Sequence, residues 1–137
     1  MCIRDSSGNR FGVGSPSTGF KFSALRLHSL TSSAWNLVSS TCPSISSCVA
    51  VVTSTSKTPW NGVVVFNPST LATTQPTVQK LAGDFQFGYR GGQIFCAAAT
   101  NCLFAGDFGN SPAIYGGDPS TWSSQQPQVL TLSLIHI

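Results

Sequence analysis

The sequence predicts an all-β protein folded as an antiparallel meander. Short runs of β-branched and aromatic residues recur along the chain, and each is bounded by Gly, Pro, Asn or Ser. The 137 residues include 13 Gly and 8 Pro but no Glu, a composition that disfavours helical bundles and coiled coils. A pair of cysteines with five residues between them occurs twice, at the same place relative to the runs that follow.

The two ends of the chain are related through their codons, and we interpret them as foreign to the protein. Residues 1–6 can be encoded by ATG TGT ATA AGA GAC AG and one further base, and residues 132–137 by CTG TCT CTT ATA CAC ATC, which contains the reverse complement. This inverted repeat resembles the transposase end sequence used as an adapter in short-read sequencing libraries. We therefore expect adapter-derived artefacts at 1–6 and 132–137, and at 7–131 a fragment of a longer chain.

Within 7–131, two similar units are expected near 35–88 and 89–131, after a partial unit before residue 35. The first cysteine pair begins at Cys42 and the second at Cys96, and the turn that follows the third strand begins at Asn67 in the first unit and at Asp118 in the second. The second unit is therefore shorter by three residues between these two features, and we place the loss in a loop. Repeated units tolerate length differences of this kind in their loops.

Residue type places the strands of each unit. The first strand runs into the first cysteine, the second is the apolar run after the second cysteine, the third is a β-branched or aromatic run, and the fourth follows a turn. The expected strands of the first unit are 37–41, 49–52, 63–66 and 77–81, and those of the second are 93–95, 103–105, 113–115 and 128–131. Strict alternation of Phe with a polar residue at 20–22 and 85–87 predicts two further half-buried strands.

Three or four strands in roughly 50 residues is the size of a propeller blade. The predicted architecture is therefore an antiparallel meander of about two to three propeller-type blades, which is an incomplete propeller. The alternative is a β-sandwich, which would not by itself predict a repeated cysteine pair.

Residues 37–51, LVSSTCPSISSCVAV, carry a family resemblance. They resemble the repeat of secreted bacterial propeller-like proteins, whose blades follow the pattern V-S-C-P-S-x-x-x-C-V-A-V. The second unit departs from this pattern, with Ala97 in place of Pro43 and Leu103 in place of Val49. The resemblance implies an extracytoplasmic propeller in which neighbouring blades of the same chain are partners, and it brings no catalytic residues.

The cysteines carry the strongest chemical signal. Without Cys2, an even number remains, and five intervening residues can be closed by a tight hairpin. We predict disulfides between Cys42 and Cys48 and between Cys96 and Cys102, and hence a secreted or cell-surface location. Four reduced thiols are one alternative. A four-cysteine zinc site is another, although structural zinc usually has two to four residues between paired ligands.

The aromatic residues are the candidates for ligand binding. Trp60 is the best of them, because it lies in the long loop 53–62, which is present only in the first unit. Trp35, Trp122 and Tyr89 are expected to pack between blades. The segment 118–122 resembles the aspartate box of sialidase-type propellers, although it is one residue short, and we expect a turn with Trp122 packed inward and no catalysis.

Composition and motifs disfavour most enzymatic and nucleic-acid functions. Residues 7–131 contain three Asp and no Glu, so they are poor hosts for the carboxylate pair of a glycosidase. The net charge of +3 is scattered, which gives no case for nucleic-acid binding, and no apolar run reaches the roughly 18 residues of a membrane span. No catalytic residue, cofactor or metal site is predicted.

The expected function is that of a non-catalytic β-repeat fragment of a secreted or cell-surface protein that binds carbohydrate or another surface ligand. The alternative is part of a propeller-type, glycosidase-like hydrolase whose catalytic residues lie outside this fragment. The shortage of carboxylates favours the first reading, so an enzymatic role is not our preferred interpretation.

Overall fold

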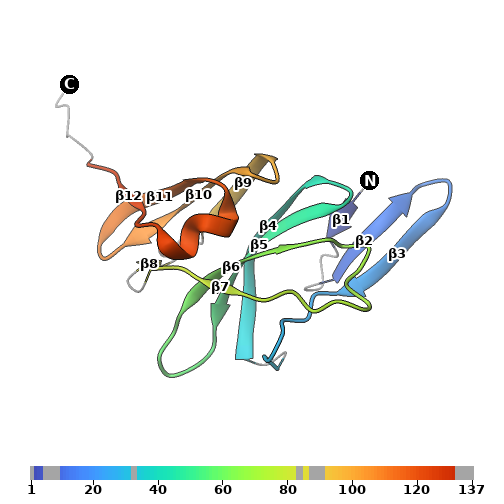
Figure 1. Cartoon of the computed structure of the whole chain (residues 1–137), viewed down its shortest axis with the longest axis horizontal. Coiled ribbons are helices and arrows are strands. Elements are labelled where there is room, and N and C mark those ends of the chain that lie inside the picture. Colours follow the sequence, from blue (N-terminus) through green and yellow to red (C-terminus); the bar gives the residue numbers. More distant parts are fainter. Residues whose placement is uncertain (1, 5–9, 32–33, 83–84, 87–91, 132–137) are drawn as a thin grey trace.

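The computed structural model of the chain describes residues 2–4, 10–31, 34–82, 85–86 and 92–131. These residues are all-β, as predicted, and form three antiparallel sheets together with a short 3-10 helix near the C-terminus. The N-terminal, central and C-terminal sheets follow one another along the long axis of the molecule, as the change from blue through green to orange shows (Figure 1).

The N-terminal sheet contains β1 (Cys2–Arg4), β2 (Arg10–Ser15) and β3 (Gly19–Ala24), in that order. β3 includes the predicted alternating segment 20–22. β1 lies inside the segment interpreted as adapter-derived and pairs antiparallel with β2. The edge of β2 therefore accepts an added strand, which is a general property of open sheet edges.

The central sheet is the meander β4 (Trp35–Ser44), β5 (Ser47–Ser54), β6 (Asn61–Phe66) and β7 (Gln79–Lys80). It contains all four strands expected for the first unit. Residues 48–52 of β5 are completely buried, on both faces of the sheet. The continuous apolar run of β5 is thus explained, because a strand with two covered faces needs no polar alternation.

The C-terminal sheet contains β9 (Gln93–Ala98), β10 (Asn101–Phe108), β11 (Ser111–Gly117) and β12 (Gln128–Val129), with the 3-10 helix η2 (Pro119–Ser124) between the last two. A short strand, β8 (Phe85–Gln86), pairs with the end of β10 that β9 leaves unpaired. The sequence places the boundary between units at 88/89, whereas strand pairing assigns β8 to the C-terminal sheet. Phe87, the third residue of the predicted segment 85–87, is outside the described residues.

The two larger sheets share one pairing register. Cys48 of β5 pairs with Phe66 of β6, and Cys102, the equivalent cysteine on β10, pairs with Gly117 of β11. The strand that follows the cysteine is thus matched in both sheets, and the three-residue difference falls in the loop after it. A two-residue turn at 109–110 closes this hairpin in the C-terminal sheet, and Gly109 has a φ of +61°, which suits the first position of a type II′ turn.

The fourth strands repeat the same geometry. Gly62 of β6 pairs with Lys80 of β7 in the central sheet, and Ala113 of β11 pairs with Val129 of β12 in the C-terminal sheet. Ala113 is the counterpart of Gly62, so Val129 is the counterpart of Lys80. From the second strand to the fourth, the length differences between the two meanders are therefore confined to loops, and the strand pairings are kept.

Two hydrophobic cores hold the three sheets together. The N-terminal core lies between the N-terminal and central sheets and consists of Phe11, Leu25, Leu27, Trp35, Cys48, Ala50, Val52, Val64, Phe66 and Leu71. The C-terminal core lies between the central and C-terminal sheets and consists of Val49, Val51, Val63, Leu81, Ile94, Cys96, Cys102, Phe104, Ala113, Tyr115 and Trp122. The central sheet is thus covered on both faces, with alternate residues of β5 contributing to different cores.

Candidate functional site

The four predicted cysteines lie at disulfide distance in the predicted pairs. Cys42 and Cys48 join β4 to β5 with a Cα–Cα distance of 4.0 Å, and Cys96 and Cys102 join β9 to β10 with the same distance. Each pair stands beside a tight hairpin, as the five-residue spacing implies. Both pairs lie on the face of their sheet that packs against the preceding sheet.

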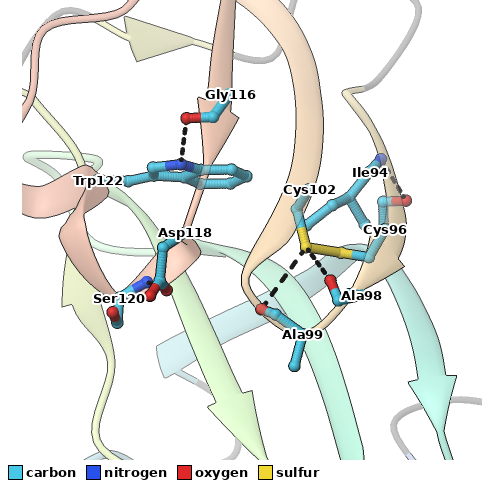
Figure 2. The surroundings of a disulfide bond; sticks show 10 residues. Ile94, Cys96, Ala98, Ala99, Cys102, Gly116, Asp118, Ser120 and Trp122 are labelled. Atoms are coloured by element: carbon cyan, nitrogen blue, oxygen red, sulfur yellow. Dashed lines mark hydrogen bonds between the residues drawn. A yellow bond between two sulfur atoms is a disulfide. The ribbon is translucent and has the colours of Figure 1, made fainter.

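The second disulfide is part of the interface between the central and C-terminal sheets (Figure 2). Cys96 and Cys102 are both buried, and the Sγ of Cys102 lies 3.6 Å from the carbonyl oxygen of Ala98. A disulfide sulfur carries no proton, so this approach is a packing contact and not a hydrogen bond. Within the described part of the chain, no group of three or more His, Cys, Asp or Glu is placed to hold a metal ion.

The turn after β11 is built around Asp118. Its Oδ1 accepts a hydrogen bond from the backbone N–H of Ser120 at 2.9 Å, and its carbonyl oxygen accepts one from the Thr121 hydroxyl at 2.8 Å. The turn after β6 makes the same two hydrogen bonds, at 3.0 and 3.2 Å, with Asn67, Ser69 and Thr70. The Asp118 carboxylate therefore has a structural task, that of shaping the turn and capping η2.

Trp122 is packed inward, as predicted. Its indole is fully buried, and its Nε1–H donates to the carbonyl oxygen of Gly116 at 3.3 Å (Figure 2). The ring stacks on Tyr115 and Phe104, with centroid distances of 5.4 and 6.3 Å. Trp35 is also buried, so both of these tryptophans serve packing. Tyr89 lies outside the described residues.

Tyr115 links the two larger sheets, a role that sequence reasoning missed. Its hydroxyl accepts a hydrogen bond from the backbone N–H of Ala82 at 3.3 Å and donates to the carbonyl oxygen of Gln125 at 3.5 Å. Burial raises the pKa of this hydroxyl above its ordinary value of about 10, and the Ala82 hydrogen bond acts in the opposite direction. Ala82 is 33 residues away, so no local pattern could have shown the contact.

Trp60 lies at the margin of the N-terminal core and is half-buried. Its backbone N–H donates to Oγ of Ser54 at 2.9 Å, which ties the long loop to the end of β5. The Lys80 ammonium lies 5.3 Å from the ring centroid, and a Cβ at Gly62 would lie 3.3 Å from Cζ3 of the indole. The ring therefore combines a packing role with partial exposure, and its part in ligand binding stays a prediction.

A cavity of about 400 Å³ opens beside the N-terminal core, lined by Leu25, Arg26, Leu27, Leu30, Trp35 and Gln75 together with Ala24. Three of its lining residues carry a side-chain hydrogen-bond donor, namely the exposed Arg26 and Gln75 and the buried Trp35. The Nε1 of Trp35 is buried and has no hydrogen-bond partner among the described residues.

No protein family, no curated protein and no solved structure matches the chain.

Proposed function

We propose that the chain is a non-catalytic β-repeat fragment of a secreted or cell-surface protein, and that its central and C-terminal sheets are consecutive blades of an incomplete propeller. The observation that carries this proposal is the shared register of the two meanders. Their second, third and fourth strands pair at equivalent positions, and their turns after the third strand make the same hydrogen bonds.

The packing of the sheets supports blades over a sandwich. A sandwich buries one inner face from each of two sheets. Here the central sheet is covered on both faces, and equivalent positions contact the preceding sheet in each case. Leu71, at the end of the turn after β6, lies in the N-terminal core, and Trp122, its counterpart after β11, lies in the C-terminal core. The sheets therefore stack head to tail, as repeated units do.

The two cysteine pairs at disulfide distance support an oxidising compartment. In the described part of the chain, no helix is long and apolar enough to cross a membrane.

Binding of carbohydrate or another surface ligand is the role we propose for this scaffold. The described carboxylates are Asp107 and Asp118, and the second shapes a turn, so the described residues favour binding over hydrolysis. The exposed part of the Trp60 ring and the cavity beside Arg26 are the places where we expect a sugar to be held.

The repeat proposal is tested by reading the source gene beyond both ends of this sequence. We expect further cysteine pairs with five intervening residues, at intervals of about 50 residues, the length of a blade-sized repeat, and an N-terminal signal peptide. A reading frame without further cysteine pairs overturns the repeat. An adjoining carboxylate-rich domain would support the alternative function, in which the chain is part of a glycosidase-like hydrolase.

The binding proposal is tested with a glycan array. Trp60→Leu keeps apolar bulk in the loop but removes the aromatic face, and we expect an at least tenfold loss of affinity for any glycan bound, which is about 1.4 kcal/mol. Ile45→Ala, an exposed apolar residue at the opposite end of β5, is the control. Equal affinities of the two variants would exclude Trp60 from the site.

A further inference from the structure

We propose that the outer face of the C-terminal sheet is the seat of a further four-stranded unit of the same kind. By the outer face we mean the side turned away from the central sheet, formed by Phe95, Leu103, Ala105, Ile114 and Leu130. The inference rests on the proposed repeat and goes further, because it assigns the residues of the interface and the face that the occupant presents.

The assignment follows from strand alternation. Phe104 is completely buried in the C-terminal core, so its neighbours Leu103 and Ala105 point to the other side of β10. Phe95 pairs directly with Leu103, and paired residues share a face. The outer face is therefore apolar over at least two adjacent strands.

Four of the five outer-face positions correspond to positions that the central sheet buries, and the fifth, Phe95, corresponds to the partly buried Thr41. Val49, the residue after Cys48, is 0% exposed beneath the C-terminal sheet, whereas Leu103, the residue after Cys102, is 48% exposed. Leu81 is 7% exposed, and Leu130, its counterpart on the fourth strand, is 37% exposed. The C-terminal sheet thus keeps apolar side chains at the positions that form an interface one unit earlier.

The most exposed of these positions is Phe95, which corresponds to Thr41 of the central sheet. Phe95 is 69% exposed, the most exposed large apolar side chain among the described residues. Residues 92–131 carry only two charged side chains, Asp107 and Asp118. By the same alternation Asp107 lies on the outer face, near the hairpin-turn end of β10, so a single carboxylate opposes burial of this face and it does so at one end. An apolar, weakly charged sheet face is typical of a protein contact.

The occupant is identified by continuity with the existing interface. The outer face of the central sheet is covered by a sheet that presents its cysteine pair and buried aromatic residues, among them Cys102, Phe104 and Trp122. Because the two outer faces correspond position by position, the same kind of surface fits the second one. The occupant is thus a unit that presents its own cysteine-bearing face.

Two hydrogen bonds join the central sheet to the C-terminal sheet, and polar or backbone groups at the equivalent positions of the C-terminal sheet can make the same bonds to a further unit. Oγ of Ser39 accepts a hydrogen bond from the backbone N–H of Ile94 at 3.3 Å, and the position equivalent to Ser39 is the exposed Gln93, whose side-chain oxygen can accept in the same way. The N–H of Ala82 donates to the hydroxyl of Tyr115, and the position equivalent to Ala82 is Thr131.

The test extends the full chain by one unit. A second copy of 83–131 is inserted after residue 131, because Thr131 is the counterpart of Ala82 and the inserted copy then begins where the C-terminal unit itself begins. In this longer chain, Leu103 of the first copy should be covered, and Leu103 of the inserted copy should be exposed. Leu103→Lys is then introduced into either copy, so that one substitution is compared in two positions of identical sequence.

We expect Leu103→Lys in the first copy to lower the melting temperature by roughly 5 °C or more, and the same change in the inserted copy to leave it within about 2 °C. Equal effects in the two copies overturn the proposal. So does an extended chain that melts no higher than the original chain, or that fails to fold where the original folds. If the source gene contains further units but this test fails, the docking proposal is overturned and the repeat proposal stands. If the gene contains no further units, the repeat proposal is overturned.

Discussion

The assignment of faces on β10 predicts opposite consequences for two adjacent residues, Phe104 and Leu103. Phe104 is fully buried between two sheets and stacks on Trp122, so Phe104→Ala removes a ring and leaves a cavity. Substitutions of this kind cost about 3–5 kcal/mol. Leu103 is about half exposed on the outer face, where solvent fills the space that truncation leaves. Full burial of a large aliphatic side chain stabilises a protein by about 1.5–3 kcal/mol, and Leu103 gains roughly half of this because it is half exposed. Leu103→Ala should therefore lower the free energy of unfolding by about 1 kcal/mol.

Urea unfolding of the two variants and the original chain, followed by tryptophan fluorescence, gives the two free energies. The measurement is made at low protein concentration and repeated at a tenfold higher one, because an exposed apolar face can self-associate. A midpoint that does not move with concentration shows that the monomer is being measured.

A larger loss of stability for Leu103→Ala than for Phe104→Ala would refute the reasoning. It would mean that the register of β10 is displaced by one residue, because such a slip exchanges the buried and exposed sets of side chains. Losses of about 3 kcal/mol or more for both variants would mean that the outer face is already covered in solution, for example by a second copy of the chain.

Three further predictions concern the disulfides, Tyr115 and the turn. Replacing Cys42 and Cys48 together by Ala should cost about 2 kcal/mol, the loop entropy of a short closed ring, and mass spectrometry without reductant should find no free thiol at either position of the parent chain. Because burial raises the pKa of Tyr115, its contribution is complete below about pH 10 and is lost as the pH rises from there through the folded pKa; urea titrations at pH 8 and 10.5 should show a smaller alkaline loss for Tyr115→Phe. Asp118→Ala should lower the unfolding free energy by about 1 kcal/mol, and Asp118→Asn, which copies the turn after β6, should restore most of it.

The strands were predictable because their signal is local. Each expected strand of the two units overlaps an observed one, since β-branched and aromatic runs bounded by turn residues indicate strands whatever they pair with. The pairing of β8 with β10 was not predictable, because it joins Phe85 to Phe108 across the whole of β9, and such a long-range pairing leaves no local pattern. The sequence assigns Phe85 to the first unit, whereas strand pairing joins it to the C-terminal sheet.

The candidate site was predictable only where its chemistry is contained in a short segment. The cysteine spacing implied a hairpin pair, and the segment 118–122 indicated a turn with an inward tryptophan. The hydrogen bond between Tyr115 and Ala82 joins two sheets, and the contact of Lys80 with Trp60 joins β7 to the loop before β6, so neither leaves a periodic pattern. The exposure of individual side chains could not be predicted either, because Val49 and Leu103 are both aliphatic. The packing of the sheets buries the first and leaves the second exposed.

The two ends of β5 differ in how far they are kept between the two meanders, and this difference indicates where a ligand site is expected. At its N-terminal end, the cysteine pair and the tight turn to β4 are kept in both meanders, and the disulfides are built into the cores. At its C-terminal end, the six-residue loop before β6 is replaced in the C-terminal sheet by the three residues between β10 and Pro112, the counterpart of Asn61. Packing of the disulfide into the core fixes the N-terminal end. The loop at the C-terminal end changes in length, and the strand pairings on either side of it are the same in both meanders. Loops that vary on a fixed scaffold are where binding specificity is usually carried, so the loop that holds Trp60 is where the two units differ most in what they can recognise.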